Sequence, residues 1–370
     1  MEQPGIGFSR TGNGNNEKSM RINEIYLGDA LDNLKSFPDE FADCVVTSPP
    51  YYRLRDYGND RQIGLEDTYE DYIAKLVAVF HEVKRVLKKD GTLWINIGDS
   101  YAGSGKGACL YPENAKKYKQ GSNRGLLGKS ALSHSNDGLK SKNLIGIPWM
   151  LAFALRDDGW YLRQDIIWSK PNPMPESVSD RCTRSHEYIF LLSKSPKYYF
   201  DAEAIAEPVA ESTIKRLQQD IEHQAGSVII GGGYNKPMTA KAPRYGGNKY
   251  TKEPDKFYRT KSGNAYQLRE KRNKRDVWTI STKPFKGSHF ATFPIQLAAN
   301  CILAGSPEGG IVIDPFIGSG TVGVVARKLN RNFVGIEINA EYKKIADLRI
   351  KDEENLFNLD STPVGMIDGV

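Results

Sequence analysis

Long apolar runs are missing from this chain of 370 residues. No run approaches the roughly 20 residues that a membrane-spanning helix needs, and the polar start at residues 1–18 has no apolar core of the kind found in signal peptides. These absences exclude a membrane partner and argue against secretion. We therefore expect a cytoplasmic protein, and its hydrophobic content of 39% is enough for a folded core.

Cysteine and histidine are scarce and widely spaced. The cysteines form no CxxC pair, and the five histidines show no metal-ligand spacing, which argues against a zinc site and a disulfide framework. We expect no bound metal, and reduced cysteines at Cys44, Cys109, Cys182 and Cys301.

Acidic residues are rare in two segments. Residues 234–275 hold 13 Lys or Arg against 3 Asp or Glu, and residues 102–143 hold 8 against 2. Because the net charge of the whole chain is +6, the rest of it carries about −10. An acidic body with two basic segments is typical of a catalytic core whose loops meet a polyanion. Solvated flexible loops are the alternative on charge alone.

Short apolar runs alternate with runs of helical period from residue 22 onward, which predicts an α/β fold. We expect strands at 22–27, 43–47, 92–97, 161–168, 187–193, 311–313 and 333–338, and helices at 30–36, 69–87, 147–155, 322–329 and 341–350. We expect five parts: a disordered tail (1–19), a first half (20–204) with a mobile basic loop (100–143), an insertion (205–280), a second half (281–350) and a C-terminal tail (351–370).

The run Thr47-Ser48-Pro49-Pro50-Tyr51 follows a short apolar strand. Two prolines cannot continue a central strand, so the chain must leave the sheet here and present Ser48, the Pro49 carbonyl and Tyr51 at the strand's carboxyl end. Open α/β sheets bind their ligands at this edge. A purely structural proline turn is the alternative.

A second loop between a strand and a helix is rich in glycine: Asp314-Pro315-Phe316-Ile317-Gly318-Ser319-Gly320-Thr321. Gly318 and Gly320 let the backbone approach a ligand closely. No lysine follows Gly320, so this is not the phosphate loop of nucleotide hydrolases. Glu337 ends the next strand about 20 residues later. In nucleotide-binding α/β folds an acid at this position holds a ribose diol. A tight turn with a surface glutamate is the alternative.

The two loops together favour methyl-transfer chemistry. Ser48 and the Pro49 carbonyl can accept hydrogen bonds from an exocyclic amino group, and Tyr51 offers a π-face to a planar base. A conjugated amino nitrogen is a poor nucleophile. Acceptors that draw it toward tetrahedral geometry expose its lone pair to an electrophile such as a methyl sulfonium.

With these motifs the chain resembles the site-specific DNA amino methyltransferases that use S-adenosylmethionine, of the class in which the catalytic motif precedes the cofactor motif. The resemblance covers about residues 22–350 and implies a Rossmann-like methyltransferase fold that is circularly permuted and carries an inserted target-recognition region. It also implies that the strands before the two loops are neighbours in the sheet. The residues that it assigns to catalysis are Ser48, Pro49, Pro50 and Tyr51. Those that it assigns to the cofactor are Asp29 (adenine), Glu337 (ribose), Phe290, Pro294, Asp314, Phe316, Gly318, Ser319, Gly320 and Thr321, and those of the target-base pocket are Trp168, Lys170 and Asn172.

The resemblance also bears on the target base. An amino group stacked inside a duplex can be reached only if its base flips into the pocket. In the family, serine before Pro-Pro-Tyr is commoner for cytosine N4 and aspartate for adenine N6, so Ser48 favours cytosine N4, with adenine N6 as the alternative. Methylation at carbon 5 of cytosine needs a cysteine nucleophile, typically after a proline, and no cysteine here follows a proline.

The predicted insertion is the expected DNA-recognition region. Its basic residues can hold phosphates, and the candidates for reading guanine edges are Arg244, Arg259, Arg269 and Arg272. Double-stranded DNA is therefore the expected partner, and the resemblance leaves room for a cognate restriction endonuclease and for a homodimer. Two competing functions stay open: an RNA or protein methyltransferase on the same fold, and a DNA-binding module with a silent cofactor site.

Overall fold

The computed structural model describes residues 20–54, 59–102, 138–210, 228–229, 233–234, 257–259, 265–267, 271–282 and 294–359. The predicted tail at 1–19, most of the predicted basic loop and the last residues of the chain lie outside these ranges. The chain divides into two compact units. The larger one consists of Met1–Asp201 with Arg275–Val370, and the smaller one of Ala202–Lys274. No helix of the described part is long and apolar enough to cross a membrane.

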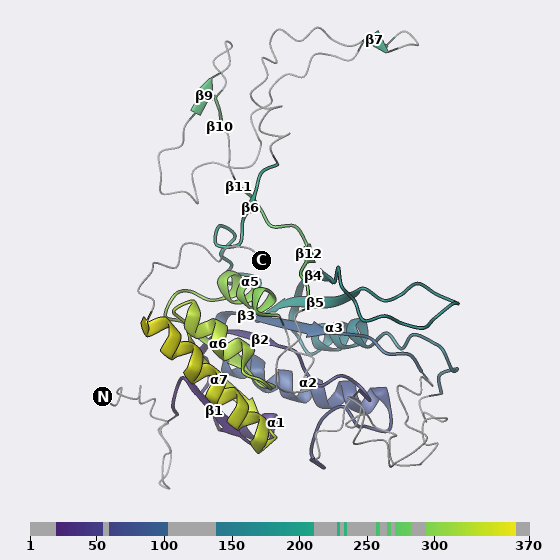
Figure 1. The fold of residues 1–370 in the computed structure, drawn as a ribbon, viewed down its shortest axis with the longest axis vertical. Coiled ribbons are helices and arrows are strands. Elements are labelled where there is room, and N and C mark those ends of the chain that lie inside the picture. The colour runs from purple at the N-terminus through teal and green to yellow at the C-terminus, as the bar shows by residue number, and fades with distance from the viewer. Residues whose placement is uncertain are drawn as a thin grey trace. The chain divides into compact units, whose positions relative to one another are not determined.

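An eight-stranded sheet forms the centre of the larger unit, in the order β1-β14-β13-β2-β3-β5-β4-β12 (Figure 1). All neighbours run parallel except β5, which is antiparallel to both β3 and β4. The strands are β1 (Glu24–Leu27), β2 (Ala42–Thr47), β3 (Leu87–Ile97), β4 (Tyr161–Ser169), β5 (His186–Ser193), β12 (Val277–Thr279), β13 (Ile311–Asp314) and β14 (Asn332–Glu337). The predicted open α/β sheet is therefore confirmed.

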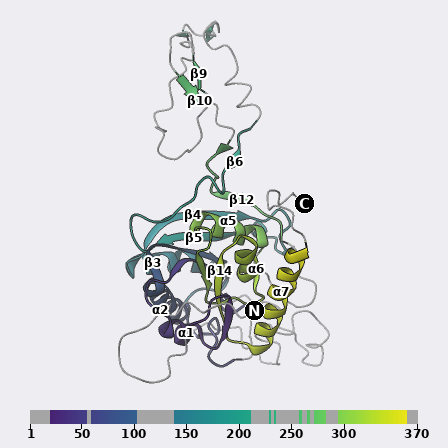
Figure 2. The same cartoon turned by 90° about the vertical axis from the view of Figure 1, so that its left-hand side faces the viewer.

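Helices cover both faces of this sheet (Figures 1 and 2). One layer consists of α1 (Ala30–Ser36), α2 (Tyr69–Val86) and α3 (Ile147–Asp157), and the other of α5 (Ile295–Gly305), α6 (Thr321–Lys328) and α7 (Ala340–Leu359). Within each layer consecutive helices pack on one another. The arrangement buries the central strands between two helical layers, which explains why β13 and β14 are buried along almost their whole length.

Helix α2 shows how local sequence produces the layers. Thr68 is its N-cap and accepts a hydrogen bond from the Asp71 amide at 3.1 Å, which satisfies one of the free amides of the first turn. Tyr72, Leu76, Val79, Phe80, Val83 and Val86 form its buried stripe. Because they recur at helical spacing, they all face the hydrophobic core.

The two loops singled out in the sequence follow neighbouring strands. β13 pairs with β2 through Val312 with Cys44 and Ile313 with Val45, so the predicted adjacency is confirmed. From this pair the chain proceeds to β14 on one side and to β3 on the other. β2 and β13 therefore flank a topological switch point, where open sheets bind ligands.

Two predicted boundaries are wrong. Residues 275–280, assigned to the insertion, belong to the larger unit, where β12 pairs with β4 and Trp278 is buried. The predicted tail at 351–370 begins too early, because α7 continues to Leu359. The smaller unit contains short paired strands: β6 (Glu207–Pro208) with β11 (Lys271–Arg272), β7 (Val228–Ile229) with β8 (Gly233–Tyr234), and β9 (Phe257–Arg259) with β10 (Ala265–Gln267).

Candidate active site

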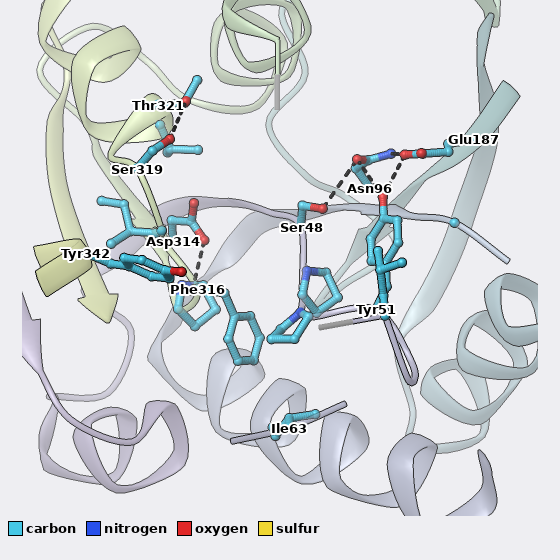
Figure 3. Close-up of a pocket in the computed structure, with 18 of the residues that line it drawn as sticks. Ser48, Tyr51, Ile63, Asn96, Glu187, Asp314, Phe316, Ser319, Thr321 and Tyr342 are labelled. Carbon is cyan, nitrogen blue, oxygen red and sulfur yellow. Dashed lines mark hydrogen bonds between the residues drawn. The ribbon is translucent and has the colours of Figure 1, made fainter. Parts of the chain in front are cut away.

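A cavity of about 710 Å³ opens at the carboxyl edge of β2 and β13. Both loops contribute to its wall, with Ser48, Pro49, Pro50 and Tyr51 from one and Asp314, Phe316, Gly318, Ser319 and Thr321 from the other (Figure 3). Its volume falls in the range of small-molecule and cofactor sites. The structure thus brings together residues that lie more than 260 positions apart in the sequence.

Thr47 and Asp314 connect the two loops directly. The Thr47 hydroxyl donates to Asp314 Oδ1 at 2.6 Å, and the Phe316 amide donates to the same oxygen at 3.0 Å. Burial, with a smaller contribution from the nearby Glu337 carboxylate, raises the pKa of Asp314 from 3.8 to about 7, although both hydrogen bonds oppose the change. A cation bound in the cavity would favour the ionised form of this acid.

The glycine loop holds Glu337 in the cavity wall. Gly318 has φ +51°, a left-handed conformation that favours glycine, and its amide donates to Glu337 Oε2 at 3.0 Å. The Asn339 amide donates to Oε1 at 2.8 Å. Burial raises the pKa of Glu337. A carboxylate has about four lone-pair sites and the backbone amides occupy three, so this acid can still accept a hydrogen bond from a diol.

The same end of the cavity is largely apolar. Phe316, Ile317, Ile336 and Tyr342 line it beside the glycine loop, and Figure 3 shows the rings of Phe316 and Tyr342 at the cavity. Asp29 also lines it and caps α1, with Oδ1 accepting from the Asp32 amide at 3.0 Å. An apolar slot, a carboxylate that can accept from a diol and a buried acid that favours a cation together fit an adenosyl sulfonium.

The proline loop forms the other end of the cavity. Tyr72 donates to the Pro50 carbonyl at 2.8 Å, which fixes the turn, while no described residue donates to the Pro49 carbonyl. The Ser48 hydroxyl donates to Asn96 Oδ1 at 3.4 Å, and the Tyr51 hydroxyl donates to Glu187 Oε2 at 2.6 Å. Serine and a free carbonyl therefore offer acceptors to an amino group at this end.

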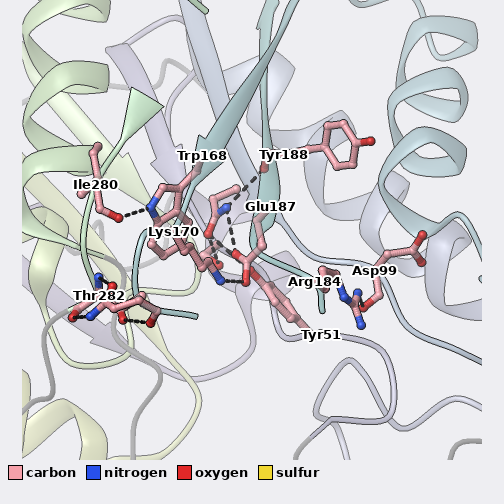
Figure 4. A network of polar contacts seen from close by, with 12 residues as sticks. Tyr51, Asp99, Trp168, Lys170, Arg184, Glu187, Tyr188, Ile280 and Thr282 are labelled. Atoms are coloured by element: carbon pink, nitrogen blue, oxygen red, sulfur yellow. Dashed lines mark hydrogen bonds and ion pairs between the residues drawn. The ribbon is translucent and has the colours of Figure 1, made fainter. Parts of the chain in front are cut away.

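Trp168 and Lys170 lie beside the proline loop at the end of β4 (Figure 4). The Lys170 ammonium lies 4.3 Å from the centre of the Trp168 ring and forms an ion pair with Glu187. Trp168 Nε1 donates to the Ile280 carbonyl at 2.8 Å. Asn172 does not line the cavity within the described part of the chain, and its amide instead exchanges two 2.9 Å hydrogen bonds with the Thr282 backbone.

Asn96 and Glu187 are cavity residues that the sequence reasoning missed. Asn96 lies near the carboxyl end of the predicted strand at 92–97, just before Gly98-Asp99. That place at the ligand-binding edge of the sheet is the sequence signal that could have identified it. Glu187 stands at the start of a strand, and only the antiparallel direction of β5 brings it to the active edge.

The remaining candidates lie elsewhere or cannot be placed. Pro294 caps α5, and Gly320 begins α6 with φ +80°; neither is among the described residues of the cavity wall. Arg272 pairs with Glu207 at 3.5 Å. Phe290, Arg244 and Arg269 lie outside the described residues, and of Arg259 only the backbone, in β9, is described. Among described residues, no group of three or more His, Cys, Asp or Glu could hold a metal.

Comparisons with known proteins agree with this geometry. Residues 42–348 match the family model N6_N4_Mtase, described as DNA methylase. The Type II methyltransferase M.SmaI of Serratia marcescens is 46% identical over 334 residues, which cover 90% of this chain and 92% of M.SmaI.

Two solved structures share the fold. TTHA0409, a putative DNA modification methylase from Thermus thermophilus complexed with S-adenosyl-L-methionine, aligns with a TM-score of 0.51 at 21% identity and covers 89% of this chain and 93% of its own. The cytosine-N4-specific PvuII DNA methyltransferase aligns with a TM-score of 0.53 at 18% identity and covers 90% of each chain. The predicted Rossmann-like methyltransferase fold is confirmed.

Proposed function

The chain belongs to the N6_N4_Mtase family of DNA methylases, and from that premise we propose that it transfers a methyl group from S-adenosylmethionine to the exocyclic N4 of cytosine at a specific site in duplex DNA. The observation that carries the proposal is the shared cavity in which the proline loop and the glycine loop meet, joined by the Thr47–Asp314 hydrogen bond. Donor and acceptor sites next to each other are what a direct transfer requires.

The glycine-loop end of the cavity is the proposed cofactor site. Glu337 would hold the ribose, the slot of Phe316, Ile336 and Tyr342 the adenine, and Asp314 the cationic methionine part. When bound, S-adenosylmethionine supplies a methyl group on a sulfonium whose sulfur keeps the bonding electron pair. The chain's own task is to exclude water from this group and to orient it toward the proline loop.

The proline-loop end is the proposed site of the flipped base. Ser48 Oγ and the Pro49 carbonyl accept the two amino hydrogens and draw the nitrogen toward tetrahedral geometry, which frees its lone pair. A nitrogen–carbon bond forms as the carbon–sulfur bond breaks, and one amino proton then leaves to solvent. Tyr51 stacks on the base, so the base stays in place without a covalent intermediate.

Serine at position 48 supports cytosine over adenine as the target. A neutral hydroxyl accepts the amino hydrogen here, and in the resembling family this form is commoner for cytosine N4. Adenine N6 is the alternative, since the same acceptors suit any exocyclic amino group. The identity of the methylated base is therefore an outcome of the experiment below.

Charge supports duplex DNA as the substrate. The 234–275 segment, with its 13 basic residues against 3 acidic ones, lies mostly in the smaller unit, and phosphate contacts dominate the affinity of DNA-binding proteins. A protein substrate would leave this segment without a role, and the family description as DNA methylase supports DNA over RNA. A silent DNA-binding module would not need Ser48, Tyr51 and Glu337 in one cavity. A cognate restriction endonuclease and a homodimer stay predictions.

The proposal is tested by expressing the chain in a methylation-free host and sequencing its plasmid and genome with a method that reports modified bases. We expect N4-methylcytosine at one short recurring sequence. The Ser48→Ala variant serves as the control and should leave that sequence unmodified. N6-methyladenine at a recurring site would overturn the choice of base, and an unmodified genome would overturn the proposed activity.

A further inference from the structure

A chain of polar side chains runs from Lys170 through Glu187 and Asn96 to Ser48. Figure 4 shows its start at Lys170 and Glu187, and Figure 3 shows Glu187, Asn96 and Ser48. It starts at an ion pair in which Lys170 and Glu187 are only 17% and 16% exposed. An ammonium can only donate hydrogen bonds, and an ionised carboxylate can only accept them. The ion pair therefore fixes Glu187 as an acceptor for its other neighbours.

Two donors use the second oxygen of Glu187. The Tyr51 hydroxyl donates to Oε2 at 2.6 Å, and Asn96 Nδ2 donates to it at 3.2 Å. Burial and the Glu187 charge raise the pKa of Tyr51 well above its ordinary value, so this hydroxyl keeps its proton. The single Tyr51 proton points to the carboxylate, because bonds to a charged acceptor are the stronger ones.

The Asn96 amide has only one orientation that suits these partners. Its Nδ2 faces two acceptors, Glu187 Oε2 and the Tyr188 carbonyl, both at 3.2 Å. Its Oδ1 then faces the hydroxyls of Tyr51 at 3.3 Å and Ser48 at 3.4 Å. Because the Tyr51 proton goes to Glu187, Ser48 is the hydroxyl that donates to Oδ1. A hydroxyl has one proton and two lone pairs, so Ser48 is left with lone pairs for a further donor in the cavity.

We infer that Glu187 is a positioning residue that, together with the Tyr188 carbonyl, sets the direction of the hydrogen bonds in this chain, and so makes Ser48 an acceptor for the amino group of the target base. The inference rests on the proposed function and deepens it. Glu187 acts through Asn96 and does not itself meet the reacting atoms. The close packing agrees: a Cβ on Gly98 would lie 2.8 Å from Tyr51 Cε2 and 3.5 Å from Glu187 Cδ.

The isosteric change Glu187→Gln tests direction rather than shape. The Lys170 ammonium would donate to the oxygen of the new side-chain amide. The nitrogen of that amide would then face Tyr51 and Asn96 as a donor. Asn96 would then lie between a donor at position 187 and an acceptor at the Tyr188 carbonyl, so either orientation of its amide has one mismatched contact. The orientation that turns its nitrogen toward Ser48 would point the Ser48 proton at the target amino group. Glu187→Gln should therefore be nearly as harmful as Glu187→Ala, with the single-turnover rate of methyl transfer lowered about 100-fold.

The measurement is single-turnover methyl transfer on a duplex carrying the site mapped for the wild-type protein, together with the cofactor Kd. We expect the cofactor Kd to stay within twofold, because the glycine-loop end is unchanged. Glu82→Gln is the matched control: Glu82 is 18% exposed, pairs with Arg85 at 2.8 Å and does not line the cavity. It should leave the rate unchanged.

A second comparison removes Lys170, the residue that would turn the nitrogen of the new amide toward Tyr51 and Asn96. With Lys170→Met in place, a glutamine at 187 is free to turn its oxygen toward Tyr51 and Asn96. The additional change Glu187→Gln should then cost less than about threefold relative to Lys170→Met alone, and this non-additivity is the signature of a directional chain.

Two results would overturn the inference: a Glu187→Gln variant that transfers methyl within threefold of wild type, or the same 100-fold cost with and without Lys170. Failure of the wild-type protein to methylate any duplex would instead overturn the proposed function. The two failures are therefore distinguishable in one set of assays.

Discussion

The Thr47 hydroxyl donates a 2.6 Å hydrogen bond to the buried carboxyl of Asp314, across the boundary between β2 and β13. This contact joins the strand that leads to the proposed base site with the strand that leads to the proposed cofactor site. Because a buried carboxyl without its donor is costly, the two loops are coupled through it.

We expect Thr47→Val to lower the free energy of unfolding by about 1–3 kcal/mol and to weaken cofactor binding. The valine keeps the volume but leaves Asp314 without the hydroxyl donor. Urea denaturation measures the first effect, and calorimetric titration with S-adenosylmethionine the second. Thr92→Val is the control, since Thr92 is also fully buried but donates to the Gly305 carbonyl at 3.3 Å, and Gly305, unlike Asp314, does not line the cavity. Equal loss of cofactor affinity in both variants would contradict the coupling.

Cofactor binding should depend on pH through Asp314. Its pKa of about 7 in the folded protein lies above the ordinary 3.8, so its contribution to stability falls as the pH rises from about 4 to 7 and is constant above that. A bound cation favours the carboxylate, so binding below pH 7 releases a proton. The cofactor Kd should tighten about tenfold between pH 6 and pH 8.

Titration in two buffers of different ionisation enthalpy would measure this proton release directly. Asp314→Asn should bind with an affinity that no longer changes over the same pH range. The same tenfold slope in Asp314→Asn would show that another group is responsible.

Substitutions at the two ends of the cavity should have opposite effects. Ser48→Ala and Tyr51→Ala should lower the rate of methyl transfer by about 100-fold and leave the cofactor Kd within twofold, because both side chains are expected to contact the base. Gly318→Val should weaken cofactor binding at least tenfold, since a β-branched residue is strained at φ +51°. Single-turnover rates and cofactor titrations separate the two effects.

Gly309→Val is the control for Gly318→Val. Gly309 also has a left-handed φ, +75°, but a Cβ there meets nothing within 4 Å, and Gly309 does not line the cavity. It should cost stability without changing the cofactor Kd. The assignment of the two ends is reversed if Ser48→Ala loses the cofactor and Gly318→Val does not.

Gly98→Ala should disturb the base end alone. The new methyl group would lie 2.8 Å from Tyr51 Cε2, so the ring must shift and its stacking on the base must weaken. We expect a fall of about tenfold in methyl transfer, since displacement of a positioned group by about 1 Å costs up to 100-fold. The cofactor Kd should not change. A variant with wild-type transfer would show that the position of the Tyr51 ring does not matter.

The sequence predicted the parts of this fold that depend on local pattern. α1 has the predicted bounds of Ala30–Ser36, because Asp29 caps it and the β-strand before it ends at Leu27. α7 extends beyond its predicted end because residues 351–359 contain neither glycine nor proline to stop it. β12 was assigned to the insertion because three residues, Val277–Thr279, are too few to show alternation beside a basic segment.

The site was predictable where it follows the carboxyl ends of strands, and the resemblance added residue roles. Ser48, Tyr51, Asp314 and Glu337 do line one cavity. Glu187 was not predictable, because a residue at the start of a strand reaches this edge only if the strand is antiparallel. Strand direction depends on tertiary pairing and cannot be read from the alternation of a single strand.

Nucleoside analysis tests the central claim most directly. The purified protein is incubated with mixed-sequence duplex DNA and S-adenosylmethionine carrying a labelled methyl group, and the DNA is digested and separated by liquid chromatography with mass spectrometry. The account predicts label in N4-methylcytosine, formed about 100-fold more slowly by Ser48→Ala. Label in 5-methylcytosine, or no label in DNA from an active preparation that binds the cofactor, would contradict it.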